Sequence, residues 1–236
     1  MIKRTKCVVS WSGGKDSALA LHSLLSNNQF EVVALLTTFD LDSAESQMHF
    51  VNTNFIQKQA DSLSLPLYIM NVATGMPRSY EEEIQKAVEH FRSLGVSHFS
   101  FGDIHLENVK QYRIELFAKL NMELLFPLWG MSSQQLMSSF YESGLKARIV
   151  VAQADKLGEE YVGKDLTKEL VSSFPADVDV CGENGEYHTF VYDSPNYAVP
   201  VNFEIEKVEE RNFRFKLLDG STVNSKFYVG RFGTFD

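Results

Sequence analysis

The residues with the clearest chemistry form a short loop near the start of the chain, Ser12-Gly13-Gly14-Lys15-Asp16-Ser17. Two adjacent glycines let the backbone turn sharply and approach a phosphate without a Cβ clash. A helix that begins here would add free N–H groups and the positive end of its dipole. The serine hydroxyls can donate hydrogen bonds, and Lys15 can place a charge beside a phosphate oxygen. The loop therefore predicts a phosphate-binding site.

The flanking sequence predicts that this loop connects a buried strand to a helix. Residues 7–12 form a short apolar run, and residues 15–27 have helical periodicity. Ligands of open α/β sheets bind at the carboxyl ends of parallel strands, which is where this loop falls. The Walker A spacing and the Rossmann G-x-G-x-x-G pattern are both absent.

The chain up to residue 153 alternates strand-like and helix-like segments, which is typical of an α/β protein with a doubly wound parallel sheet. We interpret residues 1–153 as one nucleotide-binding domain. Further strands are predicted at 31–39, 66–73, 96–103, 123–129 and 146–153. Further helices are predicted at 45–63, 80–94, 106–120 and 132–143.

Residues 154–236 are interpreted as a smaller, β-rich C-terminal appendage that closes over the first domain. A short helix is predicted at 164–172, and Asp219–Gly220 is a candidate hairpin turn. The exposed edges of such strands could pair two copies into a homo-oligomer. Strand-like segments are predicted at 186–193, 197–210, 211–219 and 226–232.

The composition excludes several classes of protein. With 236 residues, 44% of them hydrophobic, the chain can bury a sizeable core, which excludes whole-chain disorder. A net charge of −9 argues against a surface that coats nucleic acid. No apolar run reaches the length of a membrane span, and Cys7 and Cys181 are too few and too isolated for a disulfide framework. We expect a soluble cytoplasmic protein.

The loop at residues 12–17 resembles the PP-loop of the N-type ATP pyrophosphatases, which cleave ATP between the α- and β-phosphates. A second stretch, residues 181–195, is similar to the CGE-x-GE-[YF]-x-T…D-x-P signature of the diphthine–ammonia ligase family. Between them, Gly102-Asp103-Ile104 and Pro127-Leu128-Trp129 resemble that family's G-x-I and PLW segments. At residues 109–115, only the last Arg and Glu of a run typical of the family are present, which leaves the acceptor open.

The resemblance implies an ATP-dependent carboxylate–ammonia ligase. Such an enzyme adenylates a carboxylate, releases pyrophosphate, and lets ammonia displace AMP. The implied partners are ATP, Mg²⁺, ammonia and a carboxylate-bearing acceptor, with diphthine-modified elongation factor as the family's acceptor. No cysteine is placed as in a self-contained glutaminase, because the chain begins Met1-Ile2 and Cys7 falls in the first strand.

The resemblance also implies which residues form the site. Lys15 and Asp16 are expected to be catalytic, with Asp16 either orienting the loop or holding Mg²⁺ through water. Glu183 and Glu186 are expected to face the acceptor, where they could hold ammonium or accept its proton. The nucleotide is expected to contact Ser12, Gly13, Gly14, Lys15, Asp16, Ser17, Thr37, Thr38, Gly102 and Asp103.

Two other functions use the same loop. A tRNA-modifying PP-loop ATPase would need a basic RNA-binding surface and, for thiolation, suitably placed cysteines, which this acidic chain does not offer. A non-catalytic adenine-nucleotide sensor would bind ATP without releasing pyrophosphate. Such a sensor has no use for the intact loop together with Glu183 and Glu186.

Overall fold

The computed structural model describes residues 4–40, 50–73, 76–216 and 222–233. The first half of the chain builds a five-stranded sheet with strand order β3-β2-β1-β4-β5, in which every neighbouring pair is parallel. Its strands are β1 (Thr5–Ser10), β2 (Phe30–Asp40), β3 (Leu67–Val72), β4 (His98–Ser100) and β5 (Glu123–Leu125).

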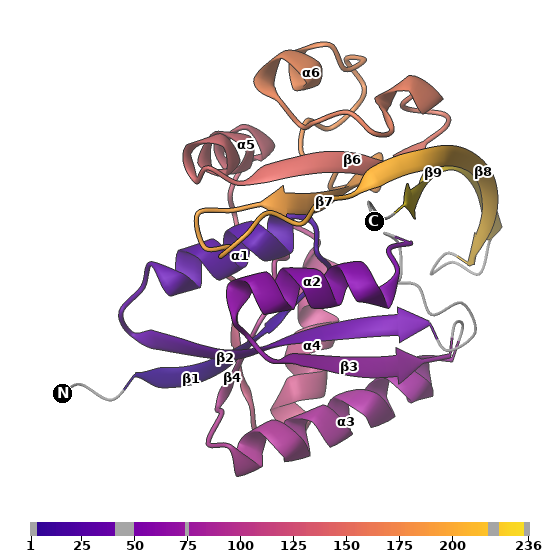
Figure 1. Cartoon of the computed structure of the whole chain (residues 1–236). Helices are drawn as coiled ribbons and strands as arrows, with labels where there is room; N and C mark the ends of the chain where they lie inside the picture. Colours follow the sequence, from indigo (N-terminus) through magenta and orange to yellow (C-terminus); the bar gives the residue numbers. More distant parts are fainter. Residues whose placement is uncertain (1–3, 41–49, 74–75, 217–221, 234–236) are drawn as a thin grey trace.

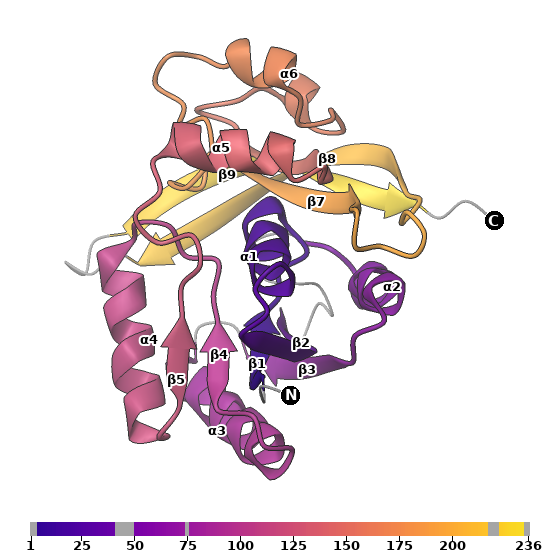
Figure 2. The same cartoon turned by 90° about the vertical axis from the view of Figure 1, so that its left-hand side faces the viewer.

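Helices cover both faces of this sheet, which confirms the doubly wound α/β prediction (Figures 1 and 2). One face packs against α1 (Lys15–Leu25) and α2 (Thr53–Leu63), and the other against α3 (Pro77–Ser93) and α4 (Glu107–Lys119). Alternate residues of β1 show the division, because Val9 belongs to the core cluster of α1 and α2 while Val8 belongs to that of α3 and α4. Among the described helices, none is long and apolar enough to cross a membrane.

The second sheet lies over α1 and α2 and has strand order β7-β6-β9-β8, with antiparallel neighbours (Figure 1). The elements of this part share one continuous core cluster with α1 and α2, so the C-terminal part does close over the first sheet. The elements of the C-terminal part are α5 (Ser133–Glu142), β6 (Lys146–Gln153), the 3₁₀ helix η1 (Glu159–Tyr161), α6 (Lys168–Ser172), β7 (Tyr187–Asp193), β8 (Glu204–Lys216) and β9 (Thr222–Gly233).

The placement of the strand at Lys146–Gln153 differs from the sequence-based expectation. It was predicted to end the α/β body, but β6 pairs with β7 and β9 in the second sheet. Its apolar run resembles a parallel strand because successive residues, which point to opposite faces of the sheet, are all buried: Ile149, Val150 and Val151 have no exposed surface. Because β6 belongs to the second sheet, the structure favours a domain boundary before α5. The proposed division at residue 153 stays a prediction.

Other differences are local. The helix predicted at 45–63 begins only at Thr53, after the N-cap Asn52, and residues 45–49 lie outside the described residues. The helix predicted at 164–172 begins at Lys168, because Asp165 instead forms a β-bridge and an ion pair with Arg148. The strand-like segments predicted at 197–210 and 211–219 contribute to a single strand, β8, and the Asp219–Gly220 turn lies outside the described residues.

Candidate active site

The PP-loop connects β1 to α1 in a conformation that only glycine tolerates. Gly13 has a positive φ of 81°, and a Cβ there would lie 2.6 Å from Cδ1 of Ile56. Gly14 is the N-cap of α1 and supplies no capping side chain, so the backbone N–H groups of the first turn are left to partners from outside the helix. The two serine hydroxyls brace the loop: Ser12 Oγ accepts from Gly14 N at 3.2 Å, and Ser17 Oγ donates to Gly14 O at 3.0 Å.

The loop lies at the switch point of the sheet, where the strand order reverses: the chain adds β2 and β3 on one side of β1, and β4 and β5 on the other. Gly102, just after β4, approaches the first turn of α1 so closely that a Cβ would lie 2.9 Å from the backbone C and O of Asp16. On the other side, β1 pairs with β2 only as far as Leu36. Thr37 and Thr38 therefore extend past the end of β1, on the side where the loop emerges.

Lys15 is a buried cation inside this site. Its side chain is 5% exposed, its Nζ lies 2.9 Å from Asp16 Oδ2, and it lies 5.4 Å from the centre of the Tyr187 ring. Burial lowers the pKa of Lys15, but the charge of Asp16, its hydrogen bond to Lys15 and the charge of Glu183 outweigh it and raise the pKa above its usual value. Lys15 is therefore an ammonium ion at neutral pH.

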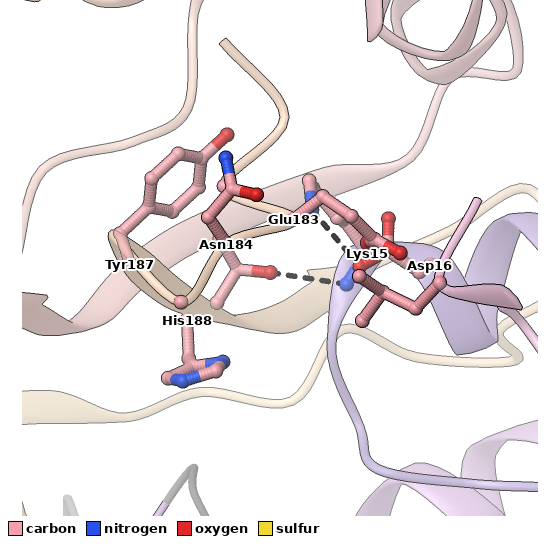
Figure 3. Close-up of a pocket in the computed structure, with 10 residues that line it drawn as sticks. Lys15, Asp16, Glu183, Asn184, Tyr187 and His188 are labelled. Carbon is pink, nitrogen blue, oxygen red and sulfur yellow. Dashed lines mark hydrogen bonds and ion pairs between the residues drawn. The ribbon is translucent and has the colours of Figure 1, made fainter. Parts of the chain in front are cut away.

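A pocket of about 350 Å³ opens beside Lys15 and Asp16 (Figure 3). Its other walls come from Leu106 and from the distant C-terminal signature, namely Gly182, Glu183, Asn184, Gly185, Tyr187, His188 and Thr189. The two motifs also touch directly, because the backbone N–H of Lys15 donates to Oγ1 of Thr189 at 3.0 Å. The phosphate-binding loop and the signature thus form one site.

The two signature glutamates have different surroundings. Glu183 lines the pocket, and in Figure 3 its side chain lies beside those of Lys15 and Asp16. Burial and the charge of Asp16 raise the pKa of Glu183, although Lys15, His105 and a backbone hydrogen bond at Ile104 oppose this shift. A carboxyl group with a raised pKa in a pocket is suited to exchange a proton with a bound substrate.

Glu186 points into its own loop instead. It is 3% exposed and accepts hydrogen bonds from the backbone N–H of Asp179 at 3.1 Å and of Asn184 at 3.0 Å. The Asn184 side-chain amide donates to it as well, at 3.0 Å. Glu186 is absent from the pocket wall, so the structure favours a positioning role for it.

Asp179 completes the support of Glu183 from the other side of the same loop. Its carboxylate accepts from the backbone N–H groups of Cys181 and Glu183, each at 3.3 Å, and from the thiol of Cys181 at 3.2 Å. Burial raises the pKa of Asp179, but hydrogen bonds from Ser133, Cys181 and Glu183 outweigh it and lower the pKa. The loop that carries Glu183 is therefore held by two carboxylates, the buried Glu186 and the half-buried Asp179, of which sequence reasoning identified only Glu186.

Asp103 lies next to Gly102 but is already paired. Arg113 of α4 donates to both of its carboxylate oxygens, at 2.7 and 3.2 Å, and the guanidinium lies 4.1 Å from the Phe101 ring. The pair braces the end of β4 against α4. Direct contact of Asp103 with nucleotide stays a prediction that this pairing does not favour.

Sequence reasoning did not single out Thr189, Asp179 or Gln59. Thr189 belongs to the quoted signature, so its position in that motif was a usable signal. Gln59 lies in the middle of α2, and nothing in its local sequence distinguishes it from the exposed Gln57 two residues earlier.

The cysteines are buried and remain protonated. Burial, with a smaller contribution from Glu31, raises the pKa of Cys7 to about 11. Burial raises the pKa of Cys181 to about 12, with its hydrogen bond to Asp179 acting in the same direction and Lys15 opposing it. Neither thiol has the lowered pKa of a nucleophile.

Asp16 is the candidate metal ligand. Its Oδ1 is buried without a hydrogen-bond partner, while Oδ2 faces Lys15. Within the part of the chain that the structure describes, no cluster of three His, Cys, Asp or Glu side chains could hold a metal ion. A site with one carboxylate fits Mg²⁺, which keeps several waters and takes its other ligands from substrate phosphates.

Comparison with known proteins identifies the family. The family model described as diphthamide synthase N-terminal domain matches residues 5–122, and that of the diphthamide synthase C-terminal domain matches residues 132–220. The chain belongs to the diphthamide synthase family. The border between the two matched regions falls just before α5, where the second sheet's part of the chain begins.

Several relatives of known identity carry the name diphthine–ammonia ligase. The zebrafish protein (Danio rerio) is 29% identical over 80% of this chain and 83% of its own length. The human protein is 27% identical over 84% of this chain and 82% of its own length. The fission yeast protein (Schizosaccharomyces pombe) is 27% identical over 85% of this chain but only 36% of its own, longer sequence. These relatives favour the ligase over the tRNA-modifying enzyme and the sensor.

Proposed function

We propose that this diphthamide synthase family protein is an ATP-dependent diphthine–ammonia ligase. The observation that carries the proposal is the shared pocket, in which Lys15 and Asp16 of the PP-loop face Glu183 of the signature loop. One pocket can then hold the α-phosphate of ATP and an acceptor carboxylate side by side. Proximity of this kind lowers the cost of bringing two substrates together.

The reaction has two steps. A carboxylate oxygen of the acceptor attacks the α-phosphorus of ATP, an acyl adenylate forms, and pyrophosphate leaves. Ammonia then attacks the carbonyl carbon, AMP leaves, and the nitrogen loses a proton to become the amide. Adenylation is needed because a free carboxylate would have to expel oxide, which is a far worse leaving group than AMP.

The residues of the PP-loop are proposed to bind the triphosphate. Backbone N–H groups at the start of α1 and the hydroxyls of Ser12 and Ser17 face the phosphates, and Gly13 and Gly14 allow the close approach. The Lys15 ammonium stabilises the charge that develops as pyrophosphate departs. The backbone at Thr37 and Thr38 is proposed to contact the adenine, and Gly102 borders the nucleotide.

Asp16 is proposed to help hold Mg²⁺, directly or through water, because its Oδ1 has no other partner. The bound ion would neutralise phosphate charge during adenylation. Glu183 is proposed to hold ammonium or to accept its proton, since its raised pKa suits proton transfer. Glu186 is proposed to act indirectly, as a positioning residue that holds the loop carrying Glu183.

The relatives' name supports diphthine and ammonia as substrates, and the family resemblance supports an elongation factor as the carrier of the diphthine. We infer that the acceptor is diphthine-modified elongation factor, that free ammonia supplies the nitrogen, and that the protein works in the cytoplasm. No membrane is required. A homo-oligomer that pairs along β7 or β8, the two edges of the second sheet, stays a prediction.

Product analysis tests the proposal. The purified protein is incubated with ATP, Mg²⁺ and ammonium, with and without diphthine-bearing elongation factor. AMP and pyrophosphate that form only with the factor, together with amidated factor, are expected. ADP and phosphate would contradict cleavage between the α- and β-phosphates, and bound but unchanged ATP in the complete mixture would contradict the ligase.

A further inference from the structure

Gln59 of α2 lies behind the PP-loop with no exposed surface. Its Nε2 donates to the backbone O of Gly13 at 3.1 Å and to that of Val191 at 2.7 Å. Its Oε1 accepts from Trp11 Nε1 at 2.9 Å. One amide therefore joins the end of β1, the PP-loop and β7.

These contacts determine how the loop's backbone is oriented. The carbonyl of Gly13 also accepts from the backbone N–H of Val191 at 2.8 Å, so it is held from two sides. In a planar trans peptide, the C=O of one residue and the N–H of the next point in opposite directions. Holding Gly13 O toward α2 and β7 therefore turns the N–H of Gly14 to the opposite side of the loop, where Ser12 Oγ now accepts from it.

Packing reinforces the same orientation. A Cβ on Gly13 would lie 2.7 Å from Gln59 Oε1, so the glycine and the amide are in close contact. Gly13 has a positive φ, and a peptide next to such a glycine can rotate easily unless it is held. Gln59 supplies this restraint without touching the side of the loop that faces the pocket.

We propose that Gln59 is a positioning residue for nucleotide binding, which holds the PP-loop peptide in its phosphate-binding orientation. The inference rests on the proposed function, because it assumes that the loop binds ATP. Pre-oriented N–H groups bind an anion more tightly because they pay no reorientation cost on binding. Loss of Gln59 should therefore weaken ATP binding more than the accompanying loss of stability explains.

The experiment compares the dissociation constant for MgATP, measured by calorimetry, with the melting temperature for three variants. Gln59→Met removes the bond to Gly13 and keeps the volume of the side chain. Trp11→Phe breaks the same network at Oε1 but leaves Gly13 O held. Gln57→Met is the surface control, because Gln57 is exposed on the same helix and its side chain donates to the exposed Asp61 at 2.8 Å.

We expect Gln59→Met to weaken MgATP binding about tenfold, and Trp11→Phe and Gln57→Met to change it less than about twofold, with Trp11→Phe also lowering the melting temperature. Equal affinities for Gln59→Met and Trp11→Phe would overturn the inference and leave a purely structural role. If Gln59→Met does not fold, Gln59→Asn, whose amide is one methylene too short to reach Gly13, is measured instead with the same expectation. A wild-type protein that binds no MgATP would overturn the proposed function itself, whereas tight wild-type binding that Gln59→Met retains overturns only the inference.

Discussion

The backbone N–H of Lys15 donates a hydrogen bond to Oγ1 of Thr189 at 3.0 Å, although 174 residues separate them in the sequence. Lys15 begins α1 beneath the second sheet, and Thr189 lies in β7 of that sheet. The first turn of the phosphate-binding helix is thus completed by the C-terminal part of the chain. Neither part alone contains the whole site, which explains why the two motifs have to be considered together.

Replacement of Lys15 tests the phosphate-binding role directly. Lys15→Met keeps the length of the side chain but removes the one lysine or arginine among the described residues that line the pocket. We expect pyrophosphate release to fall by about 10²-fold or more, because a fixed charge that stabilises a transition state is worth roughly 3 kcal/mol. The rate of pyrophosphate formation measures this.

Lys86→Met is the matched control, since Lys86 is an exposed lysine of α3 paired with Glu83. It should leave the rate within about twofold. Pyrophosphate release by Lys15→Met at the wild-type rate would remove the PP-loop from the mechanism.

Glu183 predicts a pH dependence. Because the pKa of Glu183 is raised above its usual 4.5, the residue stays partly protonated at pH values where an exposed glutamate is ionised. As a base, Glu183 is active when ionised, so kcat/KM for ammonia should rise with pH through this raised pKa. Glu183→Gln should lose most of the amidation and the acidic limb of the profile.

The same shift predicts an effect on stability. Folding favours the protonated form of Glu183, so its contribution is present at low pH and lost as the pH rises through the raised pKa. Glu183→Gln carries no charge and should be at least as stable as the wild type at pH 8, by thermal unfolding. A large drop in melting temperature would show that Glu183 is structural.

Glu186→Gln, unlike Glu183→Gln, should lower the stability of the protein. The substitution places an amide NH₂ against the N–H groups of Asp179 and Asn184, so at least one buried donor loses its acceptor. We expect a loss of about 1–3 kcal/mol of stability and slower amidation, with ATP binding retained. Normal stability combined with abolished amidation would instead assign Glu186 a direct catalytic role.

How far the sequence determines this site can be argued from particular residues. The five strands of the parallel sheet were predicted because β2 is a long apolar run and Gly95 marks the end of α3, between β3 and β4. The partner of β6 could not be predicted, because residues buried on both faces look alike in a parallel and an antiparallel sheet.

The residues of the functional site could likewise be predicted only in part from the sequence. Motif resemblance identified the PP-loop and Glu183, and the structure brings them into one pocket. The supporting contacts depend on tertiary packing: Gln59 reaches Gly13 across 46 residues and Val191 across 132. A single sequence carries no periodicity or motif that reports such a contact.

The cysteines give a prediction about reactivity. With pKa values of about 11 and 12, Cys7 and Cys181 are almost entirely thiols at pH 8, and both are buried. We expect neither to be alkylated by N-ethylmaleimide in the native protein and both to be alkylated after unfolding in guanidinium, as measured by intact-protein mass. Fast alkylation of Cys181 in the native state would contradict the buried, protonated thiol next to Asp179.

Gly102 provides a test of how closely β4 must approach the PP-loop. A Cβ at this position would lie 2.9 Å from the backbone C and O of Asp16 and 3.1 Å from Ser17 N, so the first turn of α1 must move for Gly102→Ala to fit. These atoms are backbone, which cannot rotate away as a side chain can. We therefore expect Gly102→Ala to weaken MgATP binding at least tenfold and to lower the melting temperature by several degrees.

The comparison is Gly233→Ala, at the end of β9, where the three atoms nearest to a Cβ all belong to the flexible side chain of Glu206. This variant should bind MgATP as the wild type does, because Glu206 can move aside. If Gly102→Ala also bound MgATP normally, the end of β4 would have room to retreat. The affinity for MgATP would then not depend on the close contact between Gly102 and the first turn of α1.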